Sequence, residues 1–120
     1  MIRVLVADDS RVMRQIVIRT LRQAGYEWDV REASDGAQAL EAVRADEPDV
    51  ILSDWNMPEM NGIDLLRRLR AEGFATPFGF VTSEGSPEMR ATAEAAGALF
   101  LIAKPFTPDA FRAVIDPVLA

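Results

Sequence analysis

The chain has 120 residues and a mass of 13.2 kDa, the usual size of one domain, and 13 basic against 19 acidic side chains give a formal net charge of −6. It contains no cysteine and no histidine, which excludes disulfides, thiolate or Ser-His nucleophiles and most transition-metal sites. The acidic balance disfavours nucleic acid and membranes as partners, and no apolar run suits a membrane span or signal peptide, so we expect a cytoplasmic protein that binds proteins or hard cations.

Four short apolar runs have the character of strands buried on both faces. They are 2–7 (IRVLVA), 49–53 (DVILS), 77–81 (PFGFV) and 98–102 (ALFLI). The segment 28–32 (WDVRE) alternates apolar and charged residues instead, which predicts an edge strand. Gly79 should weaken the strand in which it lies.

Apolar residues at helical spacing separate these strands, and cap signals mark where helices begin. The first helix carries Val12, Met13, Ile16, Val17, Leu21 and Ala24 and stops at Gly25; the second carries Ala39, Leu40 and Val43 and ends before Pro48; the third carries Leu65, Leu66 and Leu69 and is capped by Asn61. Ser86-Pro87 and Thr107-Pro108 open the fourth and fifth helices. Pro117 should end or kink the fifth helix near Ile115.

Strand and helix therefore alternate five times, without a linker or an internal repeat. Right-handed crossovers then predict an α/β fold: a doubly wound (βα)5, flavodoxin-like arrangement with a five-stranded parallel sheet. Because the second strand lies at an edge, we expect the strand order 2-1-3-4-5. We expect residues 1–120 to form one domain.

Polar side chains gather at the carboxyl ends of four strands, where such sheets bind ligands. Asp8 and Asp9 follow the first strand and Asp54 the third, while Thr82 with Ser83 and Lys104 follow the fourth and fifth. Each has an ordinary structural interpretation: a helix start for the paired aspartates, a turn or strand end for Asp54 and Thr82, a solvated charge for the lysine. Their convergence favours a functional site, and Lys104 is the only lysine beside twelve arginines.

The chemistry of this group indicates a metal and a phosphoryl acceptor. Carboxylates about 5 Å apart repel by roughly 3 kcal/mol per pair at an effective dielectric of about 20, and one lysine cannot offset three of them. Oxygen ligands without histidine or cysteine favour Mg²⁺. Asp54 could then accept a phosphoryl group as an acyl phosphate, with Lys104 and the metal stabilising its charge, the Thr82 hydroxyl donating to one of its oxygens, and the small Ser83 leaving room for the phosphate and offering its backbone N–H.

These residues together resemble a response-regulator receiver domain over essentially the whole chain, and the segment DWNMPEMNG (54–62) is most similar to the chemotaxis (CheY-like) branch. The resemblance implies that Asp54 takes its phosphoryl group from a phosphohistidine on a histidine kinase or histidine phosphotransfer protein. It further implies that Mg²⁺ is bound by Asp9, Asp54 and the backbone carbonyl of Asn56, with Asp8 acting through a metal-bound water. Such a domain catalyses only its own phosphorylation and slow dephosphorylation, and is not otherwise an enzyme.

The resemblance assigns roles to further residues. Lys104 would pair with Asp54 and then with the phosphate, aimed by a cis peptide bond before Pro105. Asn56 and Glu84, two residues beyond the acceptor and the threonine, would tune hydrolysis of the acyl phosphate.

The family's output face, formed by the fourth helix, fifth strand and fifth helix, would bind a downstream effector after phosphorylation. In the family the position three before the lysine is usually aromatic and turns inward as the threonine moves, but here it is Leu101, with Phe100 beside it. A leucine cannot report through a ring flip, so an aromatic switch is not expected and Phe100 is a poor substitute. We expect a monomer or weak dimer.

Two alternatives stay open on the sequence alone. One is a receiver-like interaction module that is never phosphorylated, which Leu101 favours and the intact acidic residues disfavour. The other is a phosphatase of the haloacid-dehalogenase type, whose DxD motif would have to be supplied by Asp8-Asp9-Ser10 and whose substrate cap has no room in this length.

Overall fold

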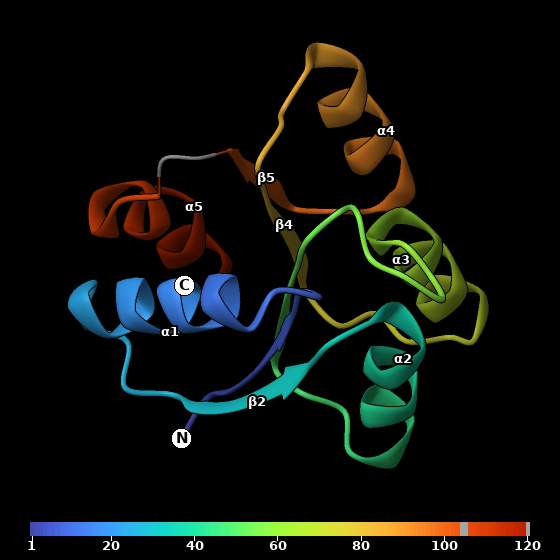
Figure 1. The fold of residues 1–120 in the computed structure, drawn as a ribbon, viewed down its shortest axis with the longest axis horizontal. Coiled ribbons are helices and arrows are strands. Elements are labelled where there is room, and N and C mark those ends of the chain that lie inside the picture. The colour runs from blue at the N-terminus through green and yellow to red at the C-terminus, as the bar shows by residue number, and fades with distance from the viewer. Residues whose placement is uncertain (104–105, 120) are drawn as a thin grey trace.

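The computed structural model describes residues 1–103 and 106–119, the last of these in its backbone only, and over them five strands alternate with five helices (Figure 1). The strands are β1 (Arg3–Ala7), β2 (Asp29–Ala33), β3 (Val50–Ser53), β4 (Phe78–Thr82) and β5 (Phe100–Ala103). The helices are α1 (Arg11–Gln23), α2 (Gly36–Ala45), α3 (Gly62–Ala71), α4 (Pro87–Ala96) and α5 (Pro108–Leu119). All ten predicted elements are confirmed.

The strands form one parallel sheet in the order β2-β1-β3-β4-β5, as the sequence predicted, with β2 at an edge. The last residue of β1, Ala7, stands level with Ala33 of β2 and Ser53 of β3. The residues that follow β1 and β3 therefore emerge beside each other at the carboxyl edge of the sheet.

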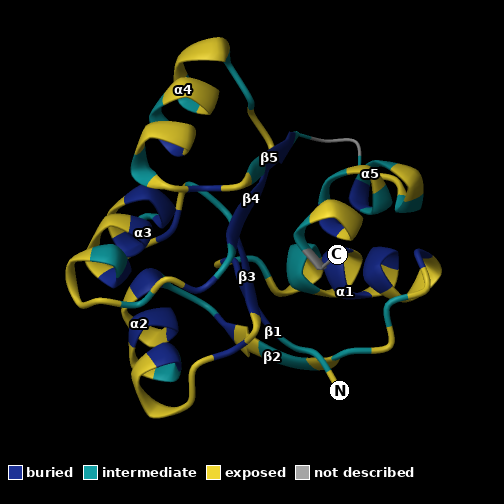
Figure 2. Ribbon diagram, turned by 180° about the vertical axis from the view of Figure 1, so that it is seen from behind, coloured by how far each residue is buried: buried dark blue, intermediate teal, exposed yellow. Residues whose placement is uncertain are grey.

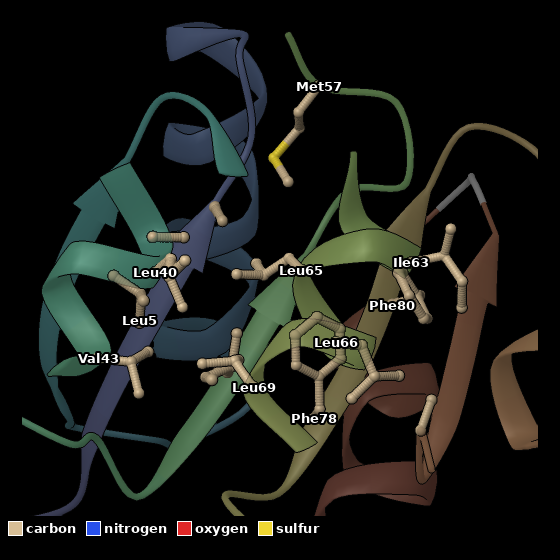
Figure 3. Close-up of a cluster of buried hydrophobic side chains, with 14 of the residues drawn as sticks. Leu5, Leu40, Val43, Met57, Ile63, Leu65, Leu66, Leu69, Phe78 and Phe80 are labelled. Carbon is tan, nitrogen blue, oxygen red and sulfur yellow. The ribbon is translucent and has the colours of Figure 1, made fainter. Parts of the chain in front are cut away.

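Helices cover both faces of the sheet: α1 and α5 lie on one side, and α2, α3 and α4 on the other (Figure 1). The central strands β1, β3 and β4 are buried between these layers, whereas the edge strand β2 is largely intermediate or exposed and the outer helix faces are exposed (Figure 2). On the side of α3, Leu65, Leu66 and Leu69 pack against Phe78 and Phe80 of β4, all fully buried (Figure 3). This dry packing fixes the central strands from which the site projects.

The predicted cap signals are present as hydrogen bonds. Asn61 Oδ1 accepts the Asp64 N–H at 2.9 Å, and Ser86 Oγ accepts the Met89 N–H at 3.1 Å. A cap of this kind contributes about 1 kcal/mol. These caps fix where α3 and α4 begin, and so where the loops beside the carboxyl edge of the sheet end.

The sequence predicted that Pro117 would end or kink α5 near Ile115. The helix instead continues through Pro117 to Leu119. Phe111 and Ile115 are buried against the α1 side of the core and hold the helix in place. Pro117 lies in the last turn, where the hydrogen bond it removes is near the helix end.

Gly79 proves to have a packing role that the sequence did not reveal. A Cβ atom at this position would lie 2.1 Å from the ring of Phe100, its neighbour across β4 and β5. Glycine is therefore what lets an aromatic ring of the edge strand pack over β4.

Among the described residues, no helix has both the length and the apolar character that crossing a bilayer requires.

Candidate functional site

The turn after β1 fixes Asp8 from several directions. Its backbone N–H donates to the carbonyl of Ala33 at 3.1 Å, and its Oδ1 accepts the Ser10 N–H at 2.9 Å. Asp8 is only 4% exposed, whereas Asp9 beside it is exposed. The residue that caps α1 is Ser10, whose Oγ accepts the Met13 N–H, so the paired aspartates are not explained as a helix start.

Asp54 follows β3 at the neighbouring position of the same edge. Its backbone N–H donates to the carbonyl of Ala7 at 2.8 Å, which ties the end of β3 to the end of β1. One carboxylate oxygen, Oδ1, accepts the Trp55 N–H at 2.7 Å. This hydrogen bond fixes the orientation of the carboxylate.

The loop after Asp54 is held close to the site by a glycine. A Cβ atom at Gly62 would lie 2.1 Å from the backbone carbonyl oxygen of Asp54, and the Gly62 N–H donates to the carbonyl of Trp55 at 2.7 Å. Within the loop Glu59 has a positive φ of 66°, which is uncommon for a residue other than glycine. Glycine at position 62 is thus required by the close approach of α3 to the residue after β3.

The three carboxylates converge. One ligand oxygen from each of Asp8, Asp9 and Asp54 can be chosen so that all lie within 4.8 Å of one another. Burial, and to a smaller extent the charges of Asp54 and Asp9, raises the pKa of Asp8 from 3.8 to about 6. Burial also raises the pKa of Asp54, despite opposing hydrogen bonds. The charged form of this cluster is disfavoured without a cation.

The donor set fits a hard divalent cation. All three side chains offer carboxylate oxygens, and the chain contains neither histidine nor cysteine to favour a softer metal. Asp8, Asp9 and Asp54 together line a small cavity of about 130 Å³ at the carboxyl edge of the sheet, large enough for an ion with water or a phosphoryl group.

Thr82 lines the same cavity. It is 1% exposed, and its Oγ1 has no hydrogen-bond partner among the residues that the structure describes. The hydroxyl lies close enough to the Asp54 carboxyl to lower its pKa, yet the geometry falls short of a hydrogen bond. An unpartnered buried hydroxyl is costly, so an oxygen atom that enters the cavity would find a donor there. Ser83, which is exposed, lines the same cavity.

Not all residues predicted for the site can be placed. Lys104 and Pro105 lie outside the described residues. Asn56 and Glu84 are both exposed, and the Asn56 N–H helps to lower the pKa of Asp54, although burial outweighs it.

The two candidate switch residues lie on opposite faces of the sheet. Leu101 is buried with the core beneath α3 and α4, whereas Phe100 packs with the cluster beneath α1 and α5. The Phe100 ring therefore lies on the opposite face of the sheet from Leu101 and cannot take the place of an aromatic residue at position 101.

Four residues at the site were missed from the sequence. Ser10, Met13 in the first turn of α1 and Val81 line the cavity, and Arg14 donates to the backbone carbonyl of Asp8. Met13 was assigned to the apolar face of its helix, and Arg14 is one of twelve arginines with no distinguishing sequence signal.

A doubly wound parallel sheet with a carboxylate cluster and a lone buried hydroxyl at its carboxyl edge is the arrangement of a receiver domain. The model of the response regulator receiver domain family matches residues 4–116, and the chain belongs to that family. Membership of this family implies a signalling protein of the two-component type.

The chain is similar to chemotaxis proteins over nearly its whole length. It is 42% identical to chemotaxis protein CheY1 of Helicobacter pylori strain J99, covering 98% of this chain and 96% of the relative. It is 41% identical to a chemotaxis protein CheY homologue of Campylobacter jejuni, covering 98% and 92%. The structure of chemotaxis protein CheY4 of Vibrio cholerae at low pH is similar with a TM-score of 0.86 and 38% identity, covering 98% of each chain.

Proposed function

We propose that residues 1–120 form the phosphoacceptor domain of a chemotaxis-type two-component pathway, in which Asp54 takes a phosphoryl group from a phosphohistidine. The observation that carries this proposal is the meeting, in one cavity, of three carboxylates with the Thr82 hydroxyl, which has no hydrogen-bond partner among the residues that the structure describes. The donor would be a histidine kinase or a histidine phosphotransfer protein.

The transfer forms one bond and breaks another. The phosphorus–nitrogen bond of the donor breaks as a bond forms between phosphorus and Asp54 Oδ2, and the donor imidazole leaves neutral after protonation of its second nitrogen. The Trp55 N–H on Oδ1 orients the carboxylate for this attack. The Thr82 hydroxyl, and the backbone N–H of Ser83, would donate to phosphoryl oxygens, and Lys104 would pair with them.

Mg²⁺ would be held by Asp9, Asp54 and the Asn56 backbone carbonyl, with Asp8 acting through a bound water. When bound, this ion supplies positive charge that offsets the carboxylates and the phosphoryl oxygens. Asn56 and Glu84, both exposed and two residues beyond Asp54 and Thr82, would tune hydrolysis of the acyl phosphate.

Phosphorylation would change partner binding through the face formed by α4, β5 and α5. Thr82 and Phe80 point to the same face of β4, and Phe80 stands opposite Leu101, so the hydroxyl and Leu101 share one side of the sheet. A groove of about 590 Å³ between α4 and β5, lined in part by Arg90, Glu94 and Leu101, lies on that face. Movement of Thr82 toward a phosphoryl oxygen would be felt at Leu101 without any aromatic flip.

Asp54→Asn should abolish phosphorylation. The protein is incubated with acetyl phosphate and Mg²⁺, and intact mass spectrometry follows the added phosphoryl group. Wild-type protein should gain one group and Asp54→Asn none, because an amide oxygen cannot form a stable acyl phosphate. Asp64→Asn, which removes an exposed carboxylate of α3, is the matched control and should behave as wild type.

Phosphate incorporation into Asp54→Asn at the wild-type rate would show that the acceptor is another residue. No incorporation into wild-type protein from either acetyl phosphate or a phosphohistidine donor would favour the unphosphorylated interaction module instead. A separate NMR experiment tests the output face. Beryllofluoride, a mimic of the phosphoryl group, is added to the protein, and the amide chemical shifts of residues in α4 and β5 should change.

A further inference from the structure

We propose that Arg14 is a positioning residue, which holds the Asp8-Asp9 turn in the geometry that binds the cation. The inference rests on the proposed function, because it concerns the same acidic site. Arg14 lies in the second turn of α1 and does not itself line the cavity. It acts through the backbone of Asp8.

The guanidinium of Arg14 joins three elements. Its Nη1 donates to the backbone carbonyl of Asp8 at 2.7 Å, and its Nε donates to Glu32 Oε1 at 2.9 Å. Glu32 lies in the edge strand β2, directly across from Val6 of β1. The arginine thus ties the end of β1 to both α1 and β2 through one rigid group.

This bond completes the fixation of Asp8. Its N–H is held by Ala33, its Oδ1 by the N–H of Ser10, and its carbonyl oxygen by Arg14. The backbone on both sides of the Asp8 Cα is therefore anchored, and the remaining carboxylate oxygen is left for the cation site. Loss of the Arg14 bond would free the peptide that joins Asp8 to Asp9, and with it the spacing of the two carboxylates.

The geometry differs from that of an ordinary surface ion pair. An exposed ion pair joins two charged side chains in water and contributes little to the stability of the fold. The Arg14 side chain is only 14% exposed, and one of its two bonds goes to a neutral carbonyl at the site. A lysine could not make both bonds with fixed geometry, because it lacks the planar fork of donors.

Arg44 provides a matched control within the same chain. It also pairs through Nε with a glutamate, Glu72, at 2.8 Å, and its side chain is 38% exposed. This pair joins the carboxyl ends of α2 and α3, at the opposite edge of the sheet from the acidic site. Replacing either arginine by methionine removes one positive charge, together with the ion pair to Glu32 at Arg14 or the ion pairs to Glu41 and Glu72 at Arg44, but only Arg14 contacts Asp8.

The first measurement is Mg²⁺ affinity, followed by the fluorescence of Trp55, whose N–H is bound to Asp54. Groups that orient a metal ligand typically change affinity by 10- to 100-fold, so the dissociation constant of Arg14→Met should rise by about tenfold or more. Arg44→Met should stay within about twofold of wild type, as surface changes usually do. The Mg²⁺ dissociation constant of Arg14→Lys should lie between those of Arg14→Met and Arg44→Met.

At saturating Mg²⁺ the rate of phosphorylation of Arg14→Met by acetyl phosphate should return close to the wild-type rate. Arg14 positions a ligand and does not touch the reacting atoms, so its loss should be felt in the Mg²⁺ requirement rather than in the maximal rate. A maximal rate that stays strongly reduced at saturating Mg²⁺ would contradict this role.

The second measurement needs no metal. In the presence of EDTA, exchange of the Ser10 amide hydrogen, which is bonded to Asp8 Oδ1, should be several-fold faster in Arg14→Met than in wild type, whereas the Leu52 amide in central β3 should exchange alike in both. Should Arg14→Met fold poorly, Glu32→Gln weakens the same link from the other end and should shift both measurements in the same direction.

The outcomes separate the two proposals. If wild-type protein gives no Mg²⁺ response, the proposed metal site itself is wrong. If wild type binds Mg²⁺ and Arg14→Met binds it equally well, or if Ser10 exchange is unchanged, only the role of Arg14 is overturned.

Discussion

Asp8 shows how a single residue can be kept for function at a cost to stability. The carboxyl is buried, and the charges of Asp54 and Asp9 beside it are of like sign. Burial and these charges raise the pKa of Asp8 from 3.8 to about 6, and the hydrogen bond from the Ser10 N–H only partly opposes them. The metal-free protein should therefore be less stable at neutral pH than it would be with a neutral group at this position.

The sign of the effect follows from proton binding. Because the folded pKa of Asp8 lies above the unfolded value, the folded state holds a proton that the unfolded state has lost between pH 3.8 and about 6. This contribution to stability is complete below pH 3.8 and is lost as the pH rises through about 6. With about 1.4 kcal/mol per pH unit, the difference is at most roughly 3 kcal/mol.

Asp8→Asn should accordingly stabilise the metal-free protein near neutral pH. We expect a gain of about 1–3 kcal/mol in the free energy of unfolding above pH 7 and little gain near pH 4, because asparagine keeps the acceptor for Ser10 without the charge. Urea unfolding in EDTA at the two pH values measures it. Equal gains at both pH values would attribute the effect to packing rather than to charge.

At the scale of the elements, regular patterns were predictable and close contacts were not. The continuous apolar run at 2–7 reflects a strand buried on both faces, and the alternation at 28–32 reflects a strand buried on one face. Together they predicted the order of the strands in the sheet. That order alone brings Asp8 and Asp54 to one edge. The packing of Phe100 over Gly79 and the bond from Arg14 to Asp8 depend on side-chain directions across different elements, which no local pattern encodes.

The continuation of α5 through Pro117 illustrates the same limit. Local propensity argues for an end near Ile115, but Phe111 and Ile115 are fully buried and the helix has only two residues beyond the proline. Tertiary packing of the two apolar residues outweighs the loss of one hydrogen bond near a helix end.

Gly79→Ala should destabilise the fold because of Phe100. The added Cβ would lie 2.1 Å from the ring, so either the ring or the edge strand must move. Overpacking of this kind costs about 1–3 kcal/mol. In a Phe100→Ala background, Gly79→Ala should cost much less. Urea unfolding of the wild type, the two single variants and the double variant gives the coupling free energy between the two positions. Additive costs would show that the ring moves aside freely and that glycine serves another purpose.

At the scale of the whole molecule, the two edges of the sheet have opposite electrostatic character. At the edge where strands begin, charges are paired: Arg3 contacts Asp46 at 2.6 Å, and Arg44 contacts Glu72 at 2.5 Å. Arg44, together with Arg68, lowers the pKa of Glu72 to about 2. At the edge where strands end, no ion pair to the Asp8, Asp9 and Asp54 side chains is present in the described part of the chain. Among the described residues, the three carboxylates of the site thus have no direct cationic partner, as expected where function sets the requirement.

Mg²⁺ should therefore stabilise the whole protein, and the stabilisation should depend on pH. A ligand at one hundred times its dissociation constant adds about 2.7 kcal/mol to the free energy of unfolding. Protons compete for the same oxygens, so the increment should be present near pH 7.5 and decline as the pH falls through about 6, the pKa of Asp8 in the metal-free protein. This trend is opposite to that of the metal-free protein, to which protonation of Asp8 adds stability. Thermal unfolding with EDTA or excess Mg²⁺ measures the increment, and Asp54→Asn should reduce it while Asp64→Asn should not. An increment of the same size near pH 4.5 and pH 7.5 would place the ion away from the three carboxylates.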